Sequence, residues 1–246
     1  MKTSTLGIGA AAAVALGLGA YALSGGDAPR AIDAAHAQSQ TETADAASGS
    51  ESGSGSAPTD AAATALTDRG YALGDVVLGN PDAPVTIMEY ASLTCPHCAS
   101  FHENVLPDVK AQLIDTGKAN LVVREVYFDA QGLWAALTAR CGGPARYHAY
   151  LDLIFADQDR LRARQEDVTV FLREVGKQGG LTQAQVDACL QDREFAESLW
   201  KTFQQQSAED QVRSTPTIFI NGELYEGPRT PEAIGAKVDE LTPNNG

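Results

Sequence analysis

The chain has 246 residues, a formal net charge of −14 and 43% hydrophobic residues. This acidity argues against binding to nucleic acids or to anionic lipid surfaces, because both require a basic patch. The length permits one or two domains with a substantial buried core.

The first 23 residues predict a targeting segment. Lys2 is followed by an uncharged run from Leu6 to Leu23 that is rich in Ala and Gly. The run is longer than the apolar part of most signal peptides and less hydrophobic than most membrane-spanning helices. We therefore predict export, and leave open whether residues 1–23 are a cleaved signal peptide or an N-terminal membrane anchor.

Residues 24–69 are predicted to form a disordered linker. Small and polar residues dominate this stretch, which includes SGSESGSGS at 48–56. Such a composition buries too little apolar surface to offset the entropy lost on ordering. The folded domain is therefore expected at 70–246.

The folded part opens with strand and helix signals. Short and longer apolar runs at 76–78 and 85–90 predict two strands, separated by a turn-forming stretch at 79–84. A helical pattern follows Cys98, and Pro107 should kink or break it before Gly117 stops it. Residues 121–128 predict a third strand, because β-branched and aromatic side chains dominate there.

Helical periodicity replaces strand signals from about 133 to 211. Within it, Thr182 and Gln185 have the spacing of a capping box. Strands return at 217–220 and 223–226, joined by the hairpin dipeptide Asn221-Gly222, and Thr230 can cap a last helix. This order of elements predicts an α/β, thioredoxin-like fold with a helical insertion at about 131–211.

The sequence Thr94-Cys95-Pro96-His97-Cys98 lies where a strand ends and a helix begins. A helix N-terminus carries about half a positive charge, which favours the thiolate of Cys95 and lowers its pKa. Two cysteines separated by two residues beside such a junction indicate a redox-active dithiol. Half of a zinc or copper site and a purely structural disulfide are the alternatives, but no second ligand pair of suitable spacing follows, so no metal site is predicted.

The Cys95-Pro96-His97-Cys98 motif, the later Thr215-Pro216 and the helical block between them resemble DsbA-like periplasmic thiol:disulfide oxidoreductases over about residues 72–242. The resemblance implies that Cys95 is the exposed nucleophile and that Cys98 is the buried partner that resolves mixed disulfides.

The resemblance also implies that Pro216 is a cis-proline beside the dithiol and that the backbone of Thr215 binds the substrate peptide. From the residues alone, a trans proline that starts an edge strand is an equal alternative for Pro216.

Two further side chains are candidates for the chemistry. Glu89 occupies the place at which thioredoxin-like proteins hold a buried carboxylate that assists proton transfer to the inner cysteine, and its pKa would rise on burial. The alternative for Glu89 is a solvent-facing side chain on an alternating strand. His97 is expected to stabilise the Cys95 thiolate, which would make the disulfide a stronger oxidant, or else to be an exposed spacer. His36, His102 and His148 are expected to be ordinary surface residues.

The remaining cysteines, Cys141 and Cys189, lie 48 positions apart in the helical block. We predict a structural disulfide between them, which the loop-entropy relation values at roughly 4 kcal/mol. Two free, buried thiols are the alternative.

The resemblance implies an enzyme that donates its disulfide to exported proteins in the periplasm, needs no cofactor and is reoxidised by a membrane-bound partner. It is expected to be a monomer, either released after signal cleavage or tethered to the inner membrane. Thr215 keeps open a reductase or isomerase on the same scaffold, because Thr also precedes the cis-proline in isomerases. A periplasmic metal carrier that uses Cys95 and Cys98 is a third alternative.

Overall fold

The computed structural model describes residues 65–242, so the predicted targeting segment and most of the predicted linker lie outside the described residues. The described structure starts earlier than the predicted boundary at 70, because β1 (Ala65–Leu66) pairs with β2 (Ala72–Leu73). No helix between residues 65 and 242 is long and apolar enough to cross a membrane.

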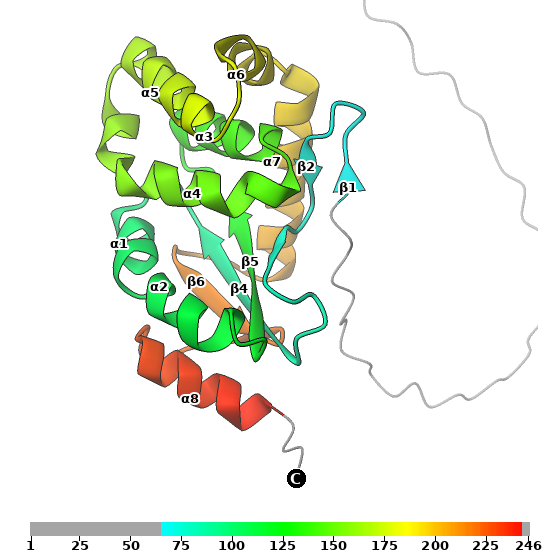
Figure 1. Ribbon diagram of the computed structural model, residues 1–246, viewed down its shortest axis with the longest axis vertical. Coiled ribbons are helices and arrows are strands. Elements are labelled where there is room, and N and C mark those ends of the chain that lie inside the picture. Colours follow the sequence, from blue (N-terminus) through cyan, green and yellow to red (C-terminus); the bar gives the residue numbers. More distant parts are fainter. Residues whose placement is uncertain (1–64, 243–246) are drawn as a thin grey trace, which may run out of the picture. The chain divides into compact units, whose positions relative to one another are not determined.

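A five-stranded mixed sheet forms the centre of the fold (Figure 1). Its strands lie in the order β3-β5-β4-β6-β7, which places β4 in the middle. β4 pairs with β5 in parallel and with β6 antiparallel. The strand bounds are β3 (Val77–Leu78), β4 (Val85–Ala91), β5 (Ala119–Glu125), β6 (Thr217–Ile220) and β7 (Glu223–Leu224).

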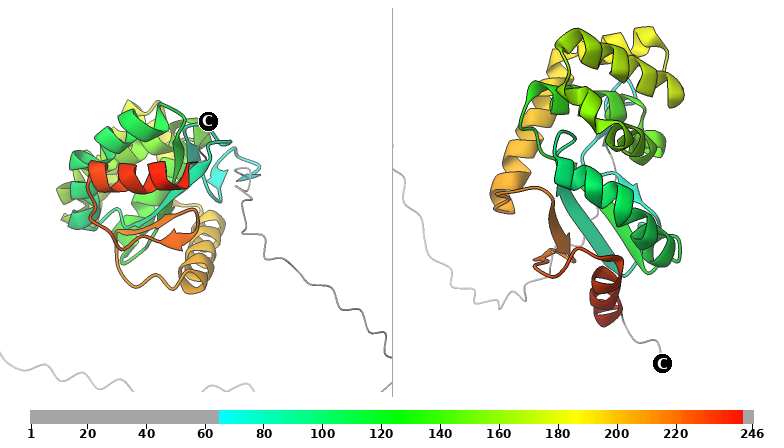
Figure 2. Two further views of the ribbon diagram at one scale, coloured as in Figure 1. Left: turned by 90° about the horizontal axis from the view of Figure 1, so that it is seen from below. Right: turned by 90° about the vertical axis from the view of Figure 1, so that its left-hand side faces the viewer.

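The helices divide into a group beside the sheet and a block inserted between β5 and β6. The first group comprises α1 (Pro96–Asn104), α2 (Leu106–Val109), the π-helical η1 (Lys110–Ile114) and α8 (Pro231–Leu241). The block comprises α3 (Ala130–Cys141), η2 (Pro144–Arg146), α4 (Tyr147–Ala156), η3 (Gln158–Arg162), α5 (Gln165–Gln178), α6 (Gln183–Leu190) and α7 (Arg193–Glu209). Figures 1 and 2 show most of the block gathered beyond one end of the sheet, with α8 at the opposite end. The predicted α/β order of elements with a helical insertion between two strands is observed.

Local sequence signals explain several element ends. Thr182 and Gln185 form the expected capping box, and Thr230 caps α8 through its side chain. Asn221 and Gly222 both have positive φ, as a two-residue hairpin turn requires. The helix after Cys95 is interrupted near Pro107, as expected.

Several predicted bounds were wrong, and β7 for example ends at Leu224 and not at residue 226. The helix begins at Pro96 and not after Cys98, so the second cysteine lies within its first turn. β5 ends at Glu125 and not at residue 128, because the chain leaves the sheet there to reach Asp129, whose side chain caps α3.

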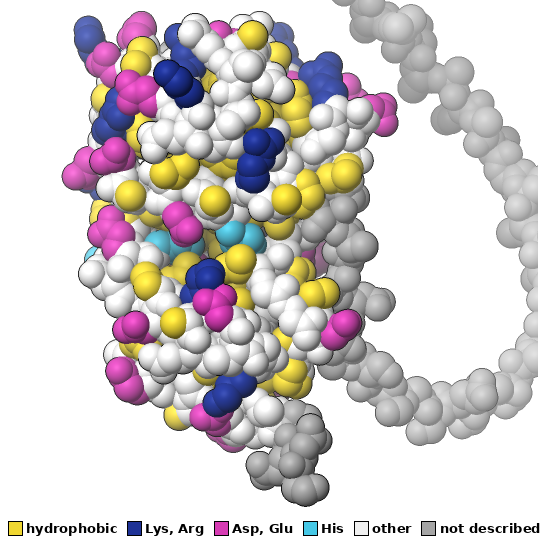
Figure 3. All heavy atoms as spheres, viewed as in Figure 1, with side chains coloured by type: hydrophobic (Ala, Val, Ile, Leu, Met, Phe, Trp, Pro, Cys, Tyr) yellow, Lys and Arg dark blue, Asp and Glu magenta, His cyan; other side chains and the backbone are white. Residues whose placement is uncertain are grey.

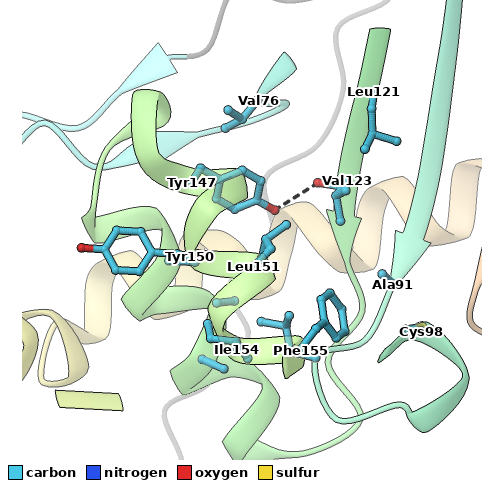
Figure 4. Close-up of a cluster of buried hydrophobic side chains, with 14 of the residues drawn as sticks. Val76, Ala91, Cys98, Leu121, Val123, Tyr147, Tyr150, Leu151, Ile154 and Phe155 are labelled. Atoms are coloured by element: carbon cyan, nitrogen blue, oxygen red, sulfur yellow. Dashed lines mark hydrogen bonds between the residues drawn. The ribbon is translucent and has the colours of Figure 1, made fainter. Parts of the chain in front are cut away.

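The two faces of β4 pack against different cores. Side chains alternate along a strand, so Val85, Ile87, Glu89 and Ala91 share one face, and each is almost fully buried. This face belongs to a continuous core that extends into the helical block, where Figure 4 shows the Tyr147 hydroxyl donating to the backbone oxygen of Val123 at 3.2 Å.

A buried ion pair joins the sheet to the helical block. The guanidinium of Arg140 on α3 donates two hydrogen bonds to the carboxylate of Glu125 at the end of β5, and a third to the backbone oxygen of Gly74. Both side chains of the pair are at most 5% exposed. Since each charge is desolvated, removal of one partner would leave the other buried without compensation.

Within the block, Cys141 at the end of α3 is joined to Cys189 on α6 by a disulfide. The structure therefore favours the cross-link over the alternative of two free thiols. A bridge across this sequence separation constrains the unfolded chain and holds the two helices together.

We predict that Arg140→Met lowers the free energy of unfolding by about 3–5 kcal/mol, because it leaves the Glu125 carboxylate buried and unpaired. Urea denaturation of the oxidised protein measures the change. Lys118→Met, which breaks an exposed ion pair with Asp239, is the matched control and should cost at most about 1 kcal/mol. Equal losses in the two variants would contradict the assigned role of the buried pair.

Candidate functional site

Cys95 sits at the junction of β4 and α1, where it is the N-cap residue of the helix. Pro96 occupies the first helical turn, where its missing N–H costs nothing. The backbone oxygen of Cys95 accepts from the amides of Cys98 and Ala99, which closes the first turn. Pro96 and His97 are exposed, Cys95 is half-buried and Cys98 is fully buried. The predicted junction thus presents one sulfur outward and seals the other inside.

The surroundings of Cys95 lower its pKa. Partial burial acts to raise it, but the Thr215 side chain and the backbone amides of Cys98 and His97 stabilise the thiolate and prevail. The protonated thiol in turn donates to the backbone oxygen of Thr215 at 3.6 Å, a contact that favours the neutral form. The net downward shift matches the effect expected of a helix N-terminus.

The pKa of the Cys98 thiol is shifted in the opposite direction. Burial raises the pKa of its thiol strongly, and the negative charge of Glu89 adds to the rise. The pKa values of the two thiols of one motif are therefore shifted in opposite directions, and the thiolate is favoured more at Cys95 than at Cys98.

Thr215 and Pro216 approach the motif from a position 120 residues further along the chain. The peptide bond between them is cis. Beside them lies a groove of about 340 Å³. Its lining consists of His97, Ser100, Phe101, Asn104, Val105, Thr215, Pro216 and Arg229. Arg229 was not a sequence candidate, since it comes from the loop before α8 and no local motif marks it.

The helical block also holds the motif in place. The Thr94 hydroxyl donates to Asp129, the cap of α3, at 2.8 Å. The side-chain amide of Gln158 donates to the backbone oxygen of Cys95 at 2.9 Å. The sequence analysis missed Gln158, because nothing in its local pattern distinguishes it from other polar residues of the block.

Glu89 lies inside the protein and not at the surface. Its side chain is fully buried on the core face of β4, and its Oε2 atom is 2.8 Å from Nε2 of His102. Oε1 of Glu89 and Nδ1 of His102 have no hydrogen-bond partner in the described part of the chain.

The expectation that His102 and His148 are ordinary surface residues was wrong. His102 is buried and stacks on Phe155 with ring centroids 4.1 Å apart. His148 is half-buried; burial lowers its pKa to about 4, and Nε2 is 2.9 Å from the backbone oxygen of Val76. The spacing of His102 four residues after Cys98 places both on the inner face of one helix, which is the signal that could have found it. His36 lies outside the described residues.

Residues 65–242 contain no group of three or more His, Cys, Asp or Glu side chains arranged to hold a metal ion. The two sulfurs of the motif thus lack converging further ligands within this range.

Comparisons with known proteins agree with this geometry. The model of a family described as Thioredoxin matches residues 72–240. A protein of Rickettsia bellii named "Putative protein-disulfide oxidoreductase" is 33% identical over 167 residues, covering 68% of this chain and 64% of the relative. A similarly named Rickettsia conorii protein is 33% identical, with 68% and 60% covered. The chain thus matches less than two thirds of the length of these relatives.

Among solved structures, Wolbachia pipientis alpha-DsbA1 superimposes with a TM-score of 0.63. The two sequences are 27% identical, and the match covers 68% of this chain and 90% of the Wolbachia chain. The predicted thioredoxin-like fold is thereby confirmed.

We predict that the two motif thiols titrate separately. In Cys98→Ala, the thiolate absorbance of Cys95 should appear below the ordinary thiol pKa of 9.0, whereas in Cys95→Ala the Cys98 thiolate should appear above it. Alkylation of Cys95 should accordingly quicken with rising pH and level off above the lowered pKa, because the thiolate is the nucleophile. Two titrations that coincide near 9.0 would contradict the asymmetry.

Proposed function

Because the chain belongs to the thioredoxin family, we propose that it is a thiol:disulfide oxidoreductase that donates its Cys95–Cys98 disulfide to exported proteins. The asymmetry of the two thiols is the observation that carries this proposal. Cys95 is reachable and its thiolate is stabilised, whereas Cys98 is sealed and its thiolate is disfavoured.

The exchange proceeds in two balanced steps. A substrate thiolate attacks the Cys95 sulfur, the bond between the two motif sulfurs breaks, and Cys98 leaves as a thiolate that takes up a proton. A second substrate thiolate then attacks the substrate sulfur of the mixed disulfide, and Cys95 leaves as its stabilised thiolate. The substrate loses two electrons and the motif gains them.

The lowered pKa of Cys95 favours the oxidising direction. A stabilised thiolate stabilises the reduced protein, so the disulfide becomes the better oxidant. One pKa unit corresponds to about 1.4 kcal/mol, which equals about 30 mV for a two-electron couple. His97 contributes through its backbone amide, and we assign its side chain a further share as part of the Pro96-His97 dipeptide.

The groove beside Thr215 and Pro216 is the proposed substrate site. It has apolar walls from Phe101, Val105 and Pro216 and is flanked by Arg229. An unfolded polypeptide offers apolar side chains and free backbone groups, which suit such a surface. We assign the backbone of Thr215, whose oxygen lies 3.6 Å from the Cys95 sulfur, the role of binding the substrate main chain.

Export is supported by the apolar segment after Lys2 and by the Cys141–Cys189 disulfide, since structural disulfides persist in oxidising compartments. We place the protein in the periplasm as a monomer, released or tethered by residues 1–23. Each donation leaves the dithiol reduced, so a membrane-bound disulfide donor is the proposed reoxidising partner.

Equilibration of the dithiol with glutathione tests the direction of exchange. We predict a potential more oxidising than the roughly −270 mV of thioredoxin. His97→Ala should make the potential more reducing by roughly 30 mV for each unit by which the pKa of Cys95 rises. Ser100→Ala, which changes another groove residue on α1, is the control and should leave the potential unchanged.

A wild-type potential as low as that of thioredoxin would contradict the oxidase assignment and favour a reductase on the same scaffold. Rescue of scrambled disulfides without added reductant would instead favour an isomerase.

A further inference from the structure

Arg229 is a cation in the proposed substrate groove, and the exchange steps described above give it no role. It directly precedes Thr230, the cap residue of α8, and it is exposed. It lines the groove of about 340 Å³ together with residues of α1 and with Thr215 and Pro216. The backbone oxygen of Thr215 lies 3.6 Å from the Cys95 sulfur. A substrate segment that reacts at Cys95 and extends into this groove therefore comes near a positive charge.

The charge of Arg229 is not neutralised by a neighbour. Most Lys and Arg side chains between residues 65 and 242 form ion pairs with Asp or Glu, and Figure 3 shows this mixture of charges on one face of the molecule. Within the same range, Arg229 forms no ion pair and no side-chain hydrogen bond. Glu226 and Glu232, its nearest acidic neighbours in the chain, do not line the groove. The N–H donors of its guanidinium are thus available to a ligand.

The groove differs in charge from the chain as a whole. The chain has a formal net charge of −14, yet no Asp or Glu lines the groove. Its other polar lining residues are His97, Ser100, Asn104 and Thr215. A cleft lined by charge of one sign attracts ligands of the opposite sign. An acidic segment, which the rest of the surface repels, is therefore attracted at this place.

The length of the groove limits how far such a carboxylate can lie from the reacting cysteine. With 100° of rotation per residue, positions 97, 100, 101 and 104 share one face of α1, and all four line the groove. From position 97 to position 104 the helix rises about 10 Å. An extended chain covers this distance in about three residues. A side chain about two to four residues from the substrate cysteine matches that length.

We propose that Arg229 is a specificity-determining residue, which selects substrate segments that carry Asp or Glu near the reacting cysteine. The inference rests on the proposed disulfide exchange and names the class of substrate. The planar guanidinium donates to the carboxylate, and its paired N–H groups match the two carboxylate oxygens. This contact favours binding of the segment before its thiolate attacks the Cys95 sulfur, and the exchange steps themselves are unchanged.

Blocked peptides of Ala and Gly with a single central Cys test the selection. One set carries a single Glu two, three or four residues before or after the Cys, and the matched set carries Gln at the same position. The oxidised full-length protein is mixed with an excess of each peptide. Acid quenching and mass spectrometry then give the rate constant for opening of the Cys95–Cys98 disulfide. The measured quantity is the ratio of the Glu to the Gln rate constant in each protein.

For at least one Glu position, we expect this ratio to be roughly twofold to fivefold higher in the wild-type protein than in Arg229→Gln, which is the range of an exposed ion pair. The effect of Glu on the peptide thiol itself cancels, because the same peptides are used with both proteins. Arg229→Lys keeps the charge without the planar guanidinium, and its ratio should lie between the other two. In about 0.5 M NaCl the wild-type ratio should fall toward that of Arg229→Gln, since salt screens exposed charges.

Arg193→Gln is the matched control. It removes the same charge from an exposed arginine at the start of α7 that does not line the groove. Its ratios should equal those of the wild-type protein, whereas a general effect of net charge would change both Gln variants alike.

Equal ratios in the wild-type protein and Arg229→Gln at every position would overturn the role of Arg229. The same change in Arg193→Gln, or an Arg229→Lys ratio no higher than that of Arg229→Gln, would also overturn it. If no peptide opens the disulfide of the wild-type protein, the proposed function fails and this inference fails with it. The two failures are distinguished by whether the Gln peptides react.

Discussion

The connection from β4 to α1 is the constraint on which the rest of the site depends. The central strand ends at Ala91 and the helix starts at Pro96, so the chain passes from a two-residue to a 3.6-residue period within a few positions. The strand period directs Glu89 into the core. The helix period leaves Cys95 at the exposed N-terminus and turns Cys98 and His102 inward. One short segment thus assigns opposite environments to two identical thiols, and the difference in their pKa follows from that placement.

Contacts with residues that lie far away in the sequence complete the site around this segment. Thr215 arrives from just before β6, while Asp129 and Gln158 arrive from the helical block. The buried Glu125–Arg140 pair fixes α3 against the end of β5, and Asp129 at the start of α3 holds Thr94. The helical block and the sheet are therefore joined at the end of the sheet that carries the dithiol. The stability of that end and the geometry of the site are linked for this reason.

Features with a local cause were predictable from the sequence. Asn221-Gly222, the capping box at Thr182 and the interruption at Pro107 each depend on residues a few positions apart. The motif cysteines and the order of the elements were predictable for the same reason. Gln158 and Arg229 were not, because they reach the site only after distant segments pack together. His102 is an intermediate case: its helical position pointed inward, but its partner Glu89 lies on a different element, and only the packed structure brings the two together.

Asp129 and Gln158 of the helical insertion each hold one residue of the dithiol segment by a hydrogen bond. This has an implication for the evolution of the insertion. Deleting the whole block would release Thr94 and the carbonyl of Cys95 from their anchors. The insertion is thus part of the wall that shapes the dithiol, and lineages that trim it would have to find other means of immobilising the same four residues.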